Sequence, residues 1–266
     1  MNAHRTVVFL PGGVTPVQPS YQPTLAELGD EIQPILKELE LYAGDQPPPG
    51  YSIELEVESL RRTVDEASLD RFHLVGFSGG GAVSLAFAAA YPQRLLSLAL
   101  FEPANVPGRW DEEEVGFWEA FMPGLGQLPP EQMMREFTRR QVRPGAELPS
   151  APPGPPAPWM AKRPAGLNAM MAAFRSEEGD RDRLRALAAP VYLSYGLLTA
   201  EFMLHRVQIL AALLPDIWIE AYEGIHHFVP PQRSRPARYA AALRWLWARA
   251  EGLTPDATTG DRTYAA

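Results

Sequence analysis

The sequence contains no cysteine, only five histidines and no long apolar run among its 266 residues. Without cysteine the chain can form no disulfide, thiolate nucleophile or cysteine-ligated metal site. A helix that crosses a bilayer needs roughly 20 consecutive apolar residues, and no uninterrupted stretch reaches that length. We therefore expect no membrane span, and a cytoplasmic setting is the default expectation.

Positive charge is also scarce. The formal net charge is -8, and no run of five or more basic residues occurs. Because proteins that bind phosphate backbones carry basic surfaces, nucleic acid is not an expected partner. No pair of histidines has the H-E-x-x-H spacing of a zinc site, so neither a metal nor another cofactor is expected. The sequence leaves the oligomeric state open.

Strand-like and helical patterns alternate along most of the chain. The expected strands cover residues 6–10, 33–39, 72–77, 95–101, 191–195 and 217–221. Helical patterns lie around Leu25, over 53–67, over 82–90, around Met203 to Leu214 and in a final helix that contains Tyr239, Leu243 and Leu246. This alternation predicts an α/β protein, with a mostly parallel sheet covered by helices on both faces.

The alternation stops in the middle of the chain. Residues 103–189 contain two or three helical patterns, separated by a proline-rich segment at 148–159 that can form neither a helix nor a central strand. Six of the eight methionines and three of the six tryptophans lie in this part. We predict a core formed by 1–102 and 190–251, an inserted helical lid over 103–189 and a disordered tail over 252–266.

One serine lies between a predicted strand and a predicted helix. Ser78 follows the strand 72–77 in the segment GFSGG at residues 76–80. In a G-x-S-x-G turn the serine has a strained backbone conformation, and glycines on either side relieve the crowding. The helix that follows directs its free N–H groups toward an oxyanion formed at the serine. The segment predicts a nucleophile elbow; a purely structural glycine turn is the alternative.

The elbow, the strand–helix alternation, the inserted helical region and a late histidine together resemble the α/β-hydrolase superfamily over residues 5–250. The resemblance implies a serine hydrolase of the carboxylesterase type with a helical lid. Ser78 matches the family's nucleophile. His227 begins the run HFVPP before the last helix and matches the family's catalytic base, because an imidazole can take and return the serine proton. His226 is the alternative base.

The first predicted loop also matches the family. The segment PGG at residues 11–13 follows the first strand, where the family usually has a His-Gly motif. The resemblance implies that the backbone N–H of Gly79 and those of Gly13 and Val14 bind the oxyanion. Pro11 replaces the usual histidine, but that position contributes backbone geometry.

The third member of the expected catalytic triad departs from the family's commonest pattern. The turn at 196–200, where the acid usually lies, contains no carboxylate. Glu102 directly follows the strand 95–101, and some family members, notably haloalkane dehalogenases, have a catalytic glutamate there. We predict Glu102 as the acid that orients the histidine. Glu201 is the alternative, and a structural role for Glu102 remains open.

The lid and the elbow are expected to enclose an apolar substrate site, since aromatic rings and thioethers form adaptable apolar surfaces. The residues predicted to contact the substrate are Phe77, Trp110, Trp118, Met122 and Trp159. Packing of the insert onto the core is the alternative explanation for these side chains.

The expected partner is a small molecule, and the expected reaction is hydrolysis of a carboxylic ester, thioester or lactone with an apolar acyl part. The same residues serve C–C hydrolysis, perhydrolysis and hydroxynitrile cleavage in this family, so these chemistries are alternatives. Ser78 argues against dehalogenase and epoxide hydrolase activity, which need a carboxylate nucleophile. A further alternative is a non-catalytic relative that binds a small molecule, since the turn at 196–200 lacks the usual acid.

Overall fold

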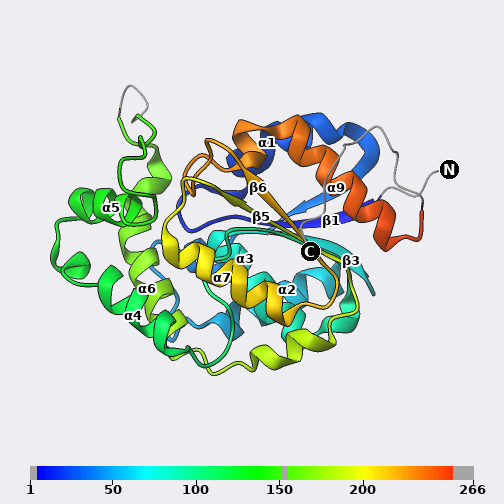
Figure 1. Cartoon of the computed structure of the whole chain (residues 1–266), viewed down its shortest axis with the longest axis horizontal. Coiled ribbons are helices and arrows are strands. Elements are labelled where there is room, and N and C mark those ends of the chain that lie inside the picture. The colour runs from blue at the N-terminus through cyan, green and yellow to red at the C-terminus, as the bar shows by residue number, and fades with distance from the viewer. Residues whose placement is uncertain (1–4, 151–154, 254–266) are drawn as a thin grey trace.

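The computed structural model describes residues 5–150 and 155–253. Its sheet is built from parallel strands in the order β2-β1-β3-β4-β5-β6 (Figure 1). The strands are β1 Arg5–Leu10, β2 Ile32–Leu36, β3 Phe72–Phe77, β4 Leu95–Phe101, β5 Val191–Gly196 and β6 Ile217–Tyr222. The predicted α/β class and parallel sheet are confirmed.

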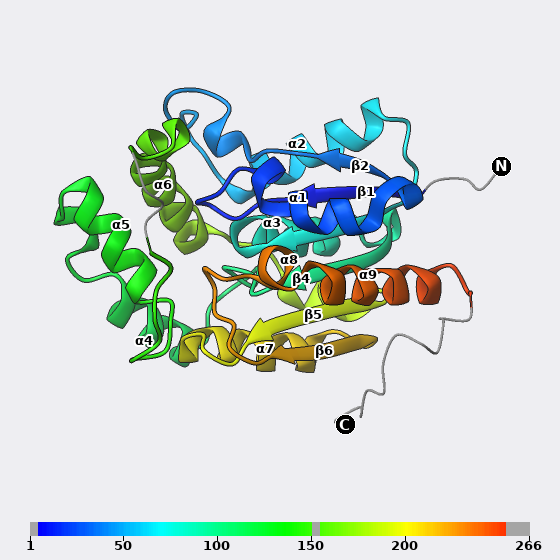
Figure 2. The same ribbon diagram turned by 90° about the horizontal axis from the view of Figure 1, so that it is seen from above.

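Helices cover both faces of this sheet. The α-helices are α1 Val17–Leu28, α2 Ile53–Glu66, α3 Ser78–Ala90, α4 Glu112–Phe121, α5 Pro130–Arg139, α6 Arg163–Ser176, α7 Glu201–Leu213, α8 Pro231–Ser234 and α9 Pro236–Ala250. The 3-10 helices are η1 Gly29–Glu31, η2 Glu40–Tyr42, η3 Pro92–Arg94, η4 Leu125–Gln127, η5 Pro158–Lys162 and η6 Arg181–Ala186. Helices α1, α8 and α9 lie on one face, and α2, α3 and α7 lie on the other (Figures 1 and 2). Within the described ranges, no helix is both long enough and apolar enough to cross a bilayer.

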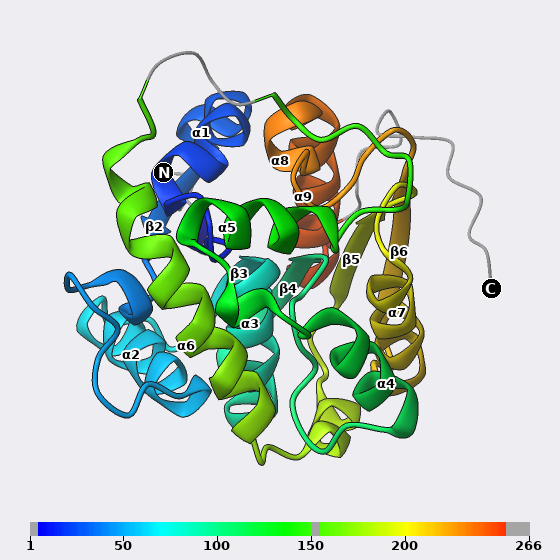
Figure 3. The same cartoon turned by 90° about the vertical axis from the view of Figure 1, so that its left-hand side faces the viewer.

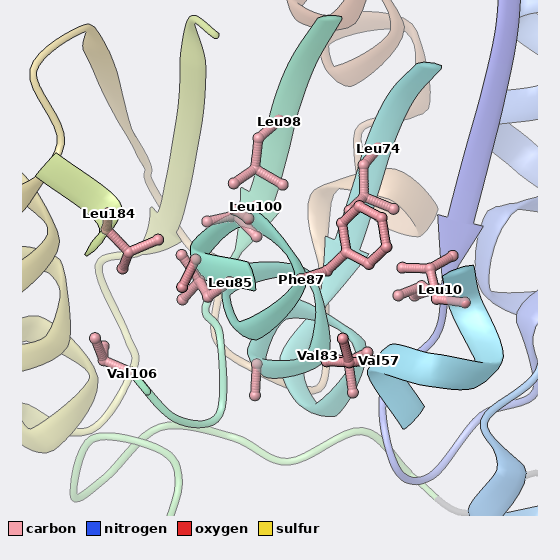
Figure 4. Packing of buried hydrophobic residues seen from close by; sticks show 14 of the residues in the cluster. Leu10, Val57, Leu74, Val83, Leu85, Phe87, Leu98, Leu100, Val106 and Leu184 are labelled. Carbon is pink, nitrogen blue, oxygen red and sulfur yellow. The ribbon is translucent and has the colours of Figure 1, made fainter. Parts of the chain in front are cut away.

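The core is divided by the sheet into two apolar layers. Side chains of a strand alternate between its faces, so Leu74 and Leu98 pack against α3, where Phe87 contributes a buried ring (Figure 4). Their neighbours Val75 and Ala99 face the opposite layer, under α1 and α9. Because the central strands are covered on both sides, they form nearly continuous apolar runs in the sequence.

The second strand is shorter than its sequence pattern predicts. The expected strand over 33–39 ends at Leu36, and the Lys37 N–H donates a last hydrogen bond to the Phe9 carbonyl. The apolar Leu39, which suggested a longer strand, instead packs into the core from the segment before η2. Pro34 is tolerated inside β2 because β2 is an edge strand, paired only with β1.

Helices α4, α5 and α6, which follow β4 and precede β5 in the sequence, form a separate layer. They lie across the carboxyl ends of the strands rather than on a face of the sheet (Figure 3). Tertiary contacts join this layer to the core: Val142 forms an antiparallel bridge with Thr199, and α6 packs on α2. Part of the proline-rich segment, residues 151–154, lies outside the described residues.

The predicted disordered tail lies almost wholly outside the described residues, which end at Leu253. Its first described residues continue the fold. The Leu253 N–H donates to the Ala248 carbonyl at 2.8 Å, so the chain is still hydrogen-bonded to the end of α9 there.

The direction of the crossovers changes between β1 and β3. The chain leaves β1 toward α1 on one face, whereas it leaves β3 toward α3 on the other face (Figure 2). At such a switch point the two loops separate and open a crevice at the carboxyl ends of the strands, which is where parallel sheets bind ligands. The loop at 11–13 and Ser78 flank this crevice.

Gly80 lies where α3 packs closely on the loop after β1, and a substitution there tests this packing. The Gly80 N–H donates to the Pro11 carbonyl at 2.9 Å, and a Cβ on Gly80 would lie 2.5 Å from that oxygen. Gly80→Ala therefore introduces a clash with backbone atoms, which outweighs the helix-propensity gain of about 1 kcal/mol. We expect destabilisation on the order of 3 kcal/mol, measured by urea unfolding.

The matched control is Gly116→Ala in the exposed part of α4, where an added Cβ meets no atom within 4 Å. It should leave stability unchanged or raise it by up to about 1 kcal/mol. Equal effects of the two substitutions would contradict the importance of the contact between α3 and the loop after β1.

Candidate active site

Ser78 lies at a strained turn between β3 and α3. Its φ is +52°, a left-handed conformation that non-glycine residues rarely adopt. Glycine is required beside it, because a Cβ on Gly76 would lie 2.4 Å from the Ser84 hydroxyl and 2.8 Å from the Gly80 carbonyl. The turn thus has the geometry that the GFSGG segment predicts. Strain of this kind is concentrated at functional sites.

A chain of hydrogen bonds joins Ser78 to a histidine and a carboxylate. The Ser78 hydroxyl and His227 Nε2 are 2.9 Å apart, and His227 Nδ1 is 2.8 Å from a Glu102 carboxylate oxygen. His227 and Glu102 are 2% and 1% exposed, so both links are shielded from water. If Nδ1–H donates to the carboxylate, Nε2 is left as the acceptor for the serine hydroxyl.

Glu102 is held by the strand next to its own. Its Oε1 accepts a hydrogen bond from the Gly196 N–H at 2.8 Å, while Oε2 faces His227. The φ of Glu102 is +40°, the second strained non-glycine residue at this site. Gly196 must itself be glycine, since a Cβ there would lie 2.2 Å from the Ile225 carbonyl. The turn at 196–200, which contains no carboxylate of its own, therefore supplies a backbone N–H donor for the carboxylate of Glu102.

The alternative residues make other contacts. His226 Nε2 lies 3.0 Å from the Glu147 carbonyl, and its Nδ1 accepts the Phe228 N–H at 3.1 Å. Burial lowers the pKa of His226, consistent with a neutral ring that anchors residue 147 of the insert. Glu201 is exposed at the first position of α7 and forms no hydrogen bond or ion pair with His226 or His227.

The other described histidines, His73 and His205, are not part of this hydrogen-bonded chain. His73 is buried against Ser97, with an Nδ1–Oγ distance of 2.8 Å, and burial lowers its pKa to about 4. His205 contacts Asp111 and Glu113 at 3.2 and 3.3 Å. His4 lies outside the described residues. Among the described residues, no three His, Asp or Glu side chains are grouped as a metal site would need.

The two backbone segments that contain the predicted oxyanion donors lie close to each other beside Ser78. Gly79 is the second residue of α3, so its N–H is one of the donors at a helix start that have no partner within the helix. The Gly13 nitrogen lies 3.6 Å from the position that a Cβ on Gly79 would occupy. Gly13 and Val14 line the cavity beside Ser78, and the Tyr42 hydroxyl holds the Gly13 carbonyl at 2.6 Å.

A largely apolar cavity opens above Ser78 and His227. The space between its walls, together with open solvent at its mouth, is about 1090 Å³. Its aromatic lining is contributed by both the core and the layer α4–α6: Phe77, Trp110, Phe117, Trp118, Phe121, Phe137, Phe174, Phe202 and Phe228. Leu167, Met170, Met171 and Met203 add aliphatic and thioether surface.

Two of the predicted contact residues do not line this cavity. Trp159 is 39% exposed in η5, and Met122 follows the last turn of α4. Phe77, Trp110 and Trp118 do line it. Composition placed aromatic and Met residues in the insert, but only the direction of each side chain decides which of them face inward.

The contribution of α7 was not anticipated from the sequence. Phe202, His205 and Arg206 line the cavity from its first turns. Their i, i+3 and i+4 spacing places them on one face of the helix. A signal was available, because a helix that directly follows a strand in a parallel sheet begins at the edge where ligands bind.

A half-buried carboxylate, Glu177, supports one wall of the cavity. The Trp110 indole N–H donates to the Asn105 side chain at 3.0 Å, and the Asn105 amide donates to Glu177 at 3.2 Å. Glu177 also accepts the Gly108 N–H at 3.3 Å. Burial raises the pKa of Glu177 to about 7, with a smaller contribution from the Glu54 carboxylate.

The family of the chain follows from its sequence match. The family model described as the alpha/beta hydrolase fold matches residues 6–154, more than half of the chain. The chain belongs to this family. The match covers β1 to β4 and therefore includes the first loop, Ser78 and Glu102.

Individual relatives show how far the similarity of this α/β hydrolase extends. It is 35% identical over 89 residues to a 2-hydroxy-6-oxo-2,4-heptadienoate hydrolase of Pseudomonas putida, a match that spans 33% of this chain and 32% of that protein. It is also 34% identical over 89 residues to the dihydrolipoyllysine-residue acetyltransferase component of an acetoin cleaving system in Cupriavidus necator, over 34% of this chain and 20% of that protein. The matches thus span a third or less of each relative's length.

Solved structures share the whole fold at low sequence identity. A thermophilic esterase of Thermogutta terrifontis is 19% identical with a TM-score of 0.68, over 93% of this chain and 91% of that one. Est816, described as an N-acyl homoserine lactone degrading enzyme, is 19% identical with a TM-score of 0.65, over 91% and 93%. These likenesses show that the fold is shared over nearly the whole chain.

The titration of Glu177, which supports the cavity wall at Trp110, makes the stability of the folded protein dependent on pH. Because its pKa is raised in the folded protein from the ordinary value of 4.5 to about 7, the folded state binds more protons than the unfolded state between these values. Stability contributed by this group is therefore lost as pH rises from about 4.5 to about 7. Glu177→Gln, which cannot ionise, should gain melting temperature over wild type at pH 8 but not at pH 5.

Thermal melts at both pH values check this expectation. Glu178→Gln, at the exposed neighbouring position, is the control and should follow the wild-type profile. A Glu177→Gln protein whose melting temperature differs from wild type by the same amount at both pH values would show that Glu177 does not titrate in this range.

Proposed function

We propose that this α/β hydrolase is a serine hydrolase that cleaves a carboxylic ester, thioester or lactone through an acyl-enzyme. The observation that carries the proposal is the hydrogen-bonded chain from Glu102 through His227 to Ser78, which ends at an apolar cavity. A neutral imidazole within hydrogen-bond distance of a serine is the arrangement that activates the hydroxyl as a nucleophile.

In the proposed mechanism, His227 Nε2 takes the proton as Ser78 Oγ attacks the ester carbonyl. Glu102 keeps the imidazole in the required tautomer and stabilises the imidazolium that forms. The N–H groups of Gly79, Gly13 and Val14 are the proposed donors to the oxyanion; loss of one such donor typically lowers kcat by about 10²-fold to 10³-fold. The tetrahedral intermediate then expels the alcohol, which receives its proton from His227.

Water completes the cycle. It attacks the acyl-enzyme with His227 again acting as the base, and collapse of the second intermediate releases the acid and restores Ser78.

We propose that α4, α5 and α6, the layer across the carboxyl ends of the strands, act as the lid of this site. Their aromatic side chains would receive the apolar part of the substrate and exclude water during acyl transfer.

A second candidate function is hydrolysis of a C–C bond. It is favoured by the 35% identity over 89 residues to a 2-hydroxy-6-oxo-2,4-heptadienoate hydrolase. The two candidates are separated by substrate: an ester screen and a vinylogous 1,5-diketone acid assayed in parallel decide which bond is broken faster.

Labelling with a fluorophosphonate tests the nucleophile without a choice of substrate. We expect rapid labelling at Ser78, located by mass spectrometry, and loss of that labelling in His227→Ala because the base is absent. The control is His226→Gln, which alters the adjacent histidine and should keep most of the labelling rate. Absence of labelling in a folded wild-type protein would favour a non-catalytic binding protein.

The acid is tested by comparing two glutamates. Glu102→Gln should lower kcat by about 10³-fold to 10⁴-fold, since removal of the charge leaves the imidazole in the wrong tautomer. Glu201→Gln is the matched control and should leave kcat near the wild-type value. The reverse pattern, with Glu201→Gln inactive and Glu102→Gln active, would refute the proposed triad.

A further inference from the structure

One cation in the cavity has no acidic partner. Arg206 lines the cavity from α7. Its guanidinium contacts the Met203 sulfur, 3.3 Å from Nη1, and lies over the Phe202 ring, with Cζ 4.9 Å from the ring centroid. A thioether is a weak acceptor. Among the described residues, no carboxylate oxygen lies within 4.0 Å of an Arg206 nitrogen.

The nearby acids are already paired with other groups. Glu114 lines the same cavity, but its two oxygens contact Arg181 at 2.9 and 3.3 Å. The Glu102 oxygens face Gly196 and His227. Both carboxylates act on Arg206 only through space, so its N–H donors are not used to neutralise them.

Desolvation is unfavourable for this guanidinium. Burial lowers the pKa of Arg206 to about 10, although Glu114 and Glu102 act in the opposite direction. The half-buried group therefore stays charged at neutral pH in a mostly apolar cavity, where the Met203 sulfur is its only acceptor among the described residues. A buried charge without a partner is costly, and a planar guanidinium matches a carboxylate through two parallel hydrogen bonds.

We propose that Arg206 binds a carboxylate of the substrate, so that this enzyme acts on esters that also carry a free acid group. The inference rests on the proposed hydrolase function, because it assigns the substrate class of the same cavity. A carboxylate is favoured over a phosphate, because a single guanidinium balances the one charge of a carboxylate and donates a hydrogen bond to each of its oxygens. Among the described residues, the other cavity-lining arginine is Arg233, which is exposed to solvent.

The proposal is tested by substrate selectivity. We would measure kcat/KM for p-nitrophenyl monoesters of succinic, glutaric and adipic acid, and for the same compounds with the free acid methylated. The wild-type enzyme should prefer the free acid at one chain length or more. Arg206→Gln should lower the ratio of acid to methylated substrate at least about tenfold, since hydrogen bonds to charged groups contribute about one to two orders of magnitude.

Two further variants make this ratio specific to the guanidinium. Arg206→Lys keeps the charge but not the fork, so its ratio should lie between those of wild type and Arg206→Gln; it also carries the test if Arg206→Gln does not fold. Arg183→Gln removes an exposed arginine of η6 and should keep the wild-type ratio. A wild type without preference for the free acid, or a ratio that Arg206→Gln leaves unchanged while both rates fall, overturns the proposal.

Equilibrium binding separates this proposal from the catalytic one. Calorimetry with glutarate, succinate and adipate on Ser78→Ala needs no turnover, and Arg206→Gln in that background should weaken binding at least about tenfold. If the wild-type enzyme hydrolyses no ester but the dicarboxylates still bind in an Arg206-dependent way, the hydrolase function is refuted and the carboxylate site is supported. Equal binding by the two proteins, or none by either, overturns the site itself.

Discussion

The buried carboxylate of Glu102 connects three parts of the chain that are far apart in sequence. It follows β4, accepts the N–H of Gly196 at the end of β5, and faces His227 in the loop after β6. A carboxylate that is 1% exposed is stable only when its lone pairs are satisfied. The ends of these strands must therefore keep their relative positions, and the orientation of His227 toward Ser78 depends on the same contact.

The parallel sheet makes that contact possible. Because β3, β4, β5 and β6 run side by side in the same direction, the segments after them emerge at one edge. Ser78 and Glu102 both have positive φ there, and the layers of apolar side chains on either side of the sheet hold these strained turns in place. The stability of the core thus supports the geometry of the site.

The insert has a different relation to the core. Its helices contribute most of the aromatic lining of the cavity, and Glu114, the acidic residue that it adds to this lining, is paired with Arg181 of the same insert. Arg206, a half-buried cation of the lining without such a pair among the described residues, comes from α7 of the core. The proposed division of labour is that the insert provides apolar volume, whereas the core provides both the reactive groups and the charge that selects a substrate.

The sequence by itself determined the local features of this protein. The alternation of strand and helix patterns predicted the parallel sheet, and strands 72–77 and 95–101 have the predicted bounds. The strained turn at Ser78 was predictable because the glycines that permit it are neighbours in the chain.

Tertiary structure decided what depends on side-chain direction and on distant segments. It brought His227 rather than His226 to Ser78, and Glu102 rather than Glu201 to His227. It also placed Arg206 in the lining of the cavity and left Met122 and Trp159 outside it. The physical reason is that residues more than a hundred positions apart meet through the register and twist of a whole sheet, which no local pattern encodes.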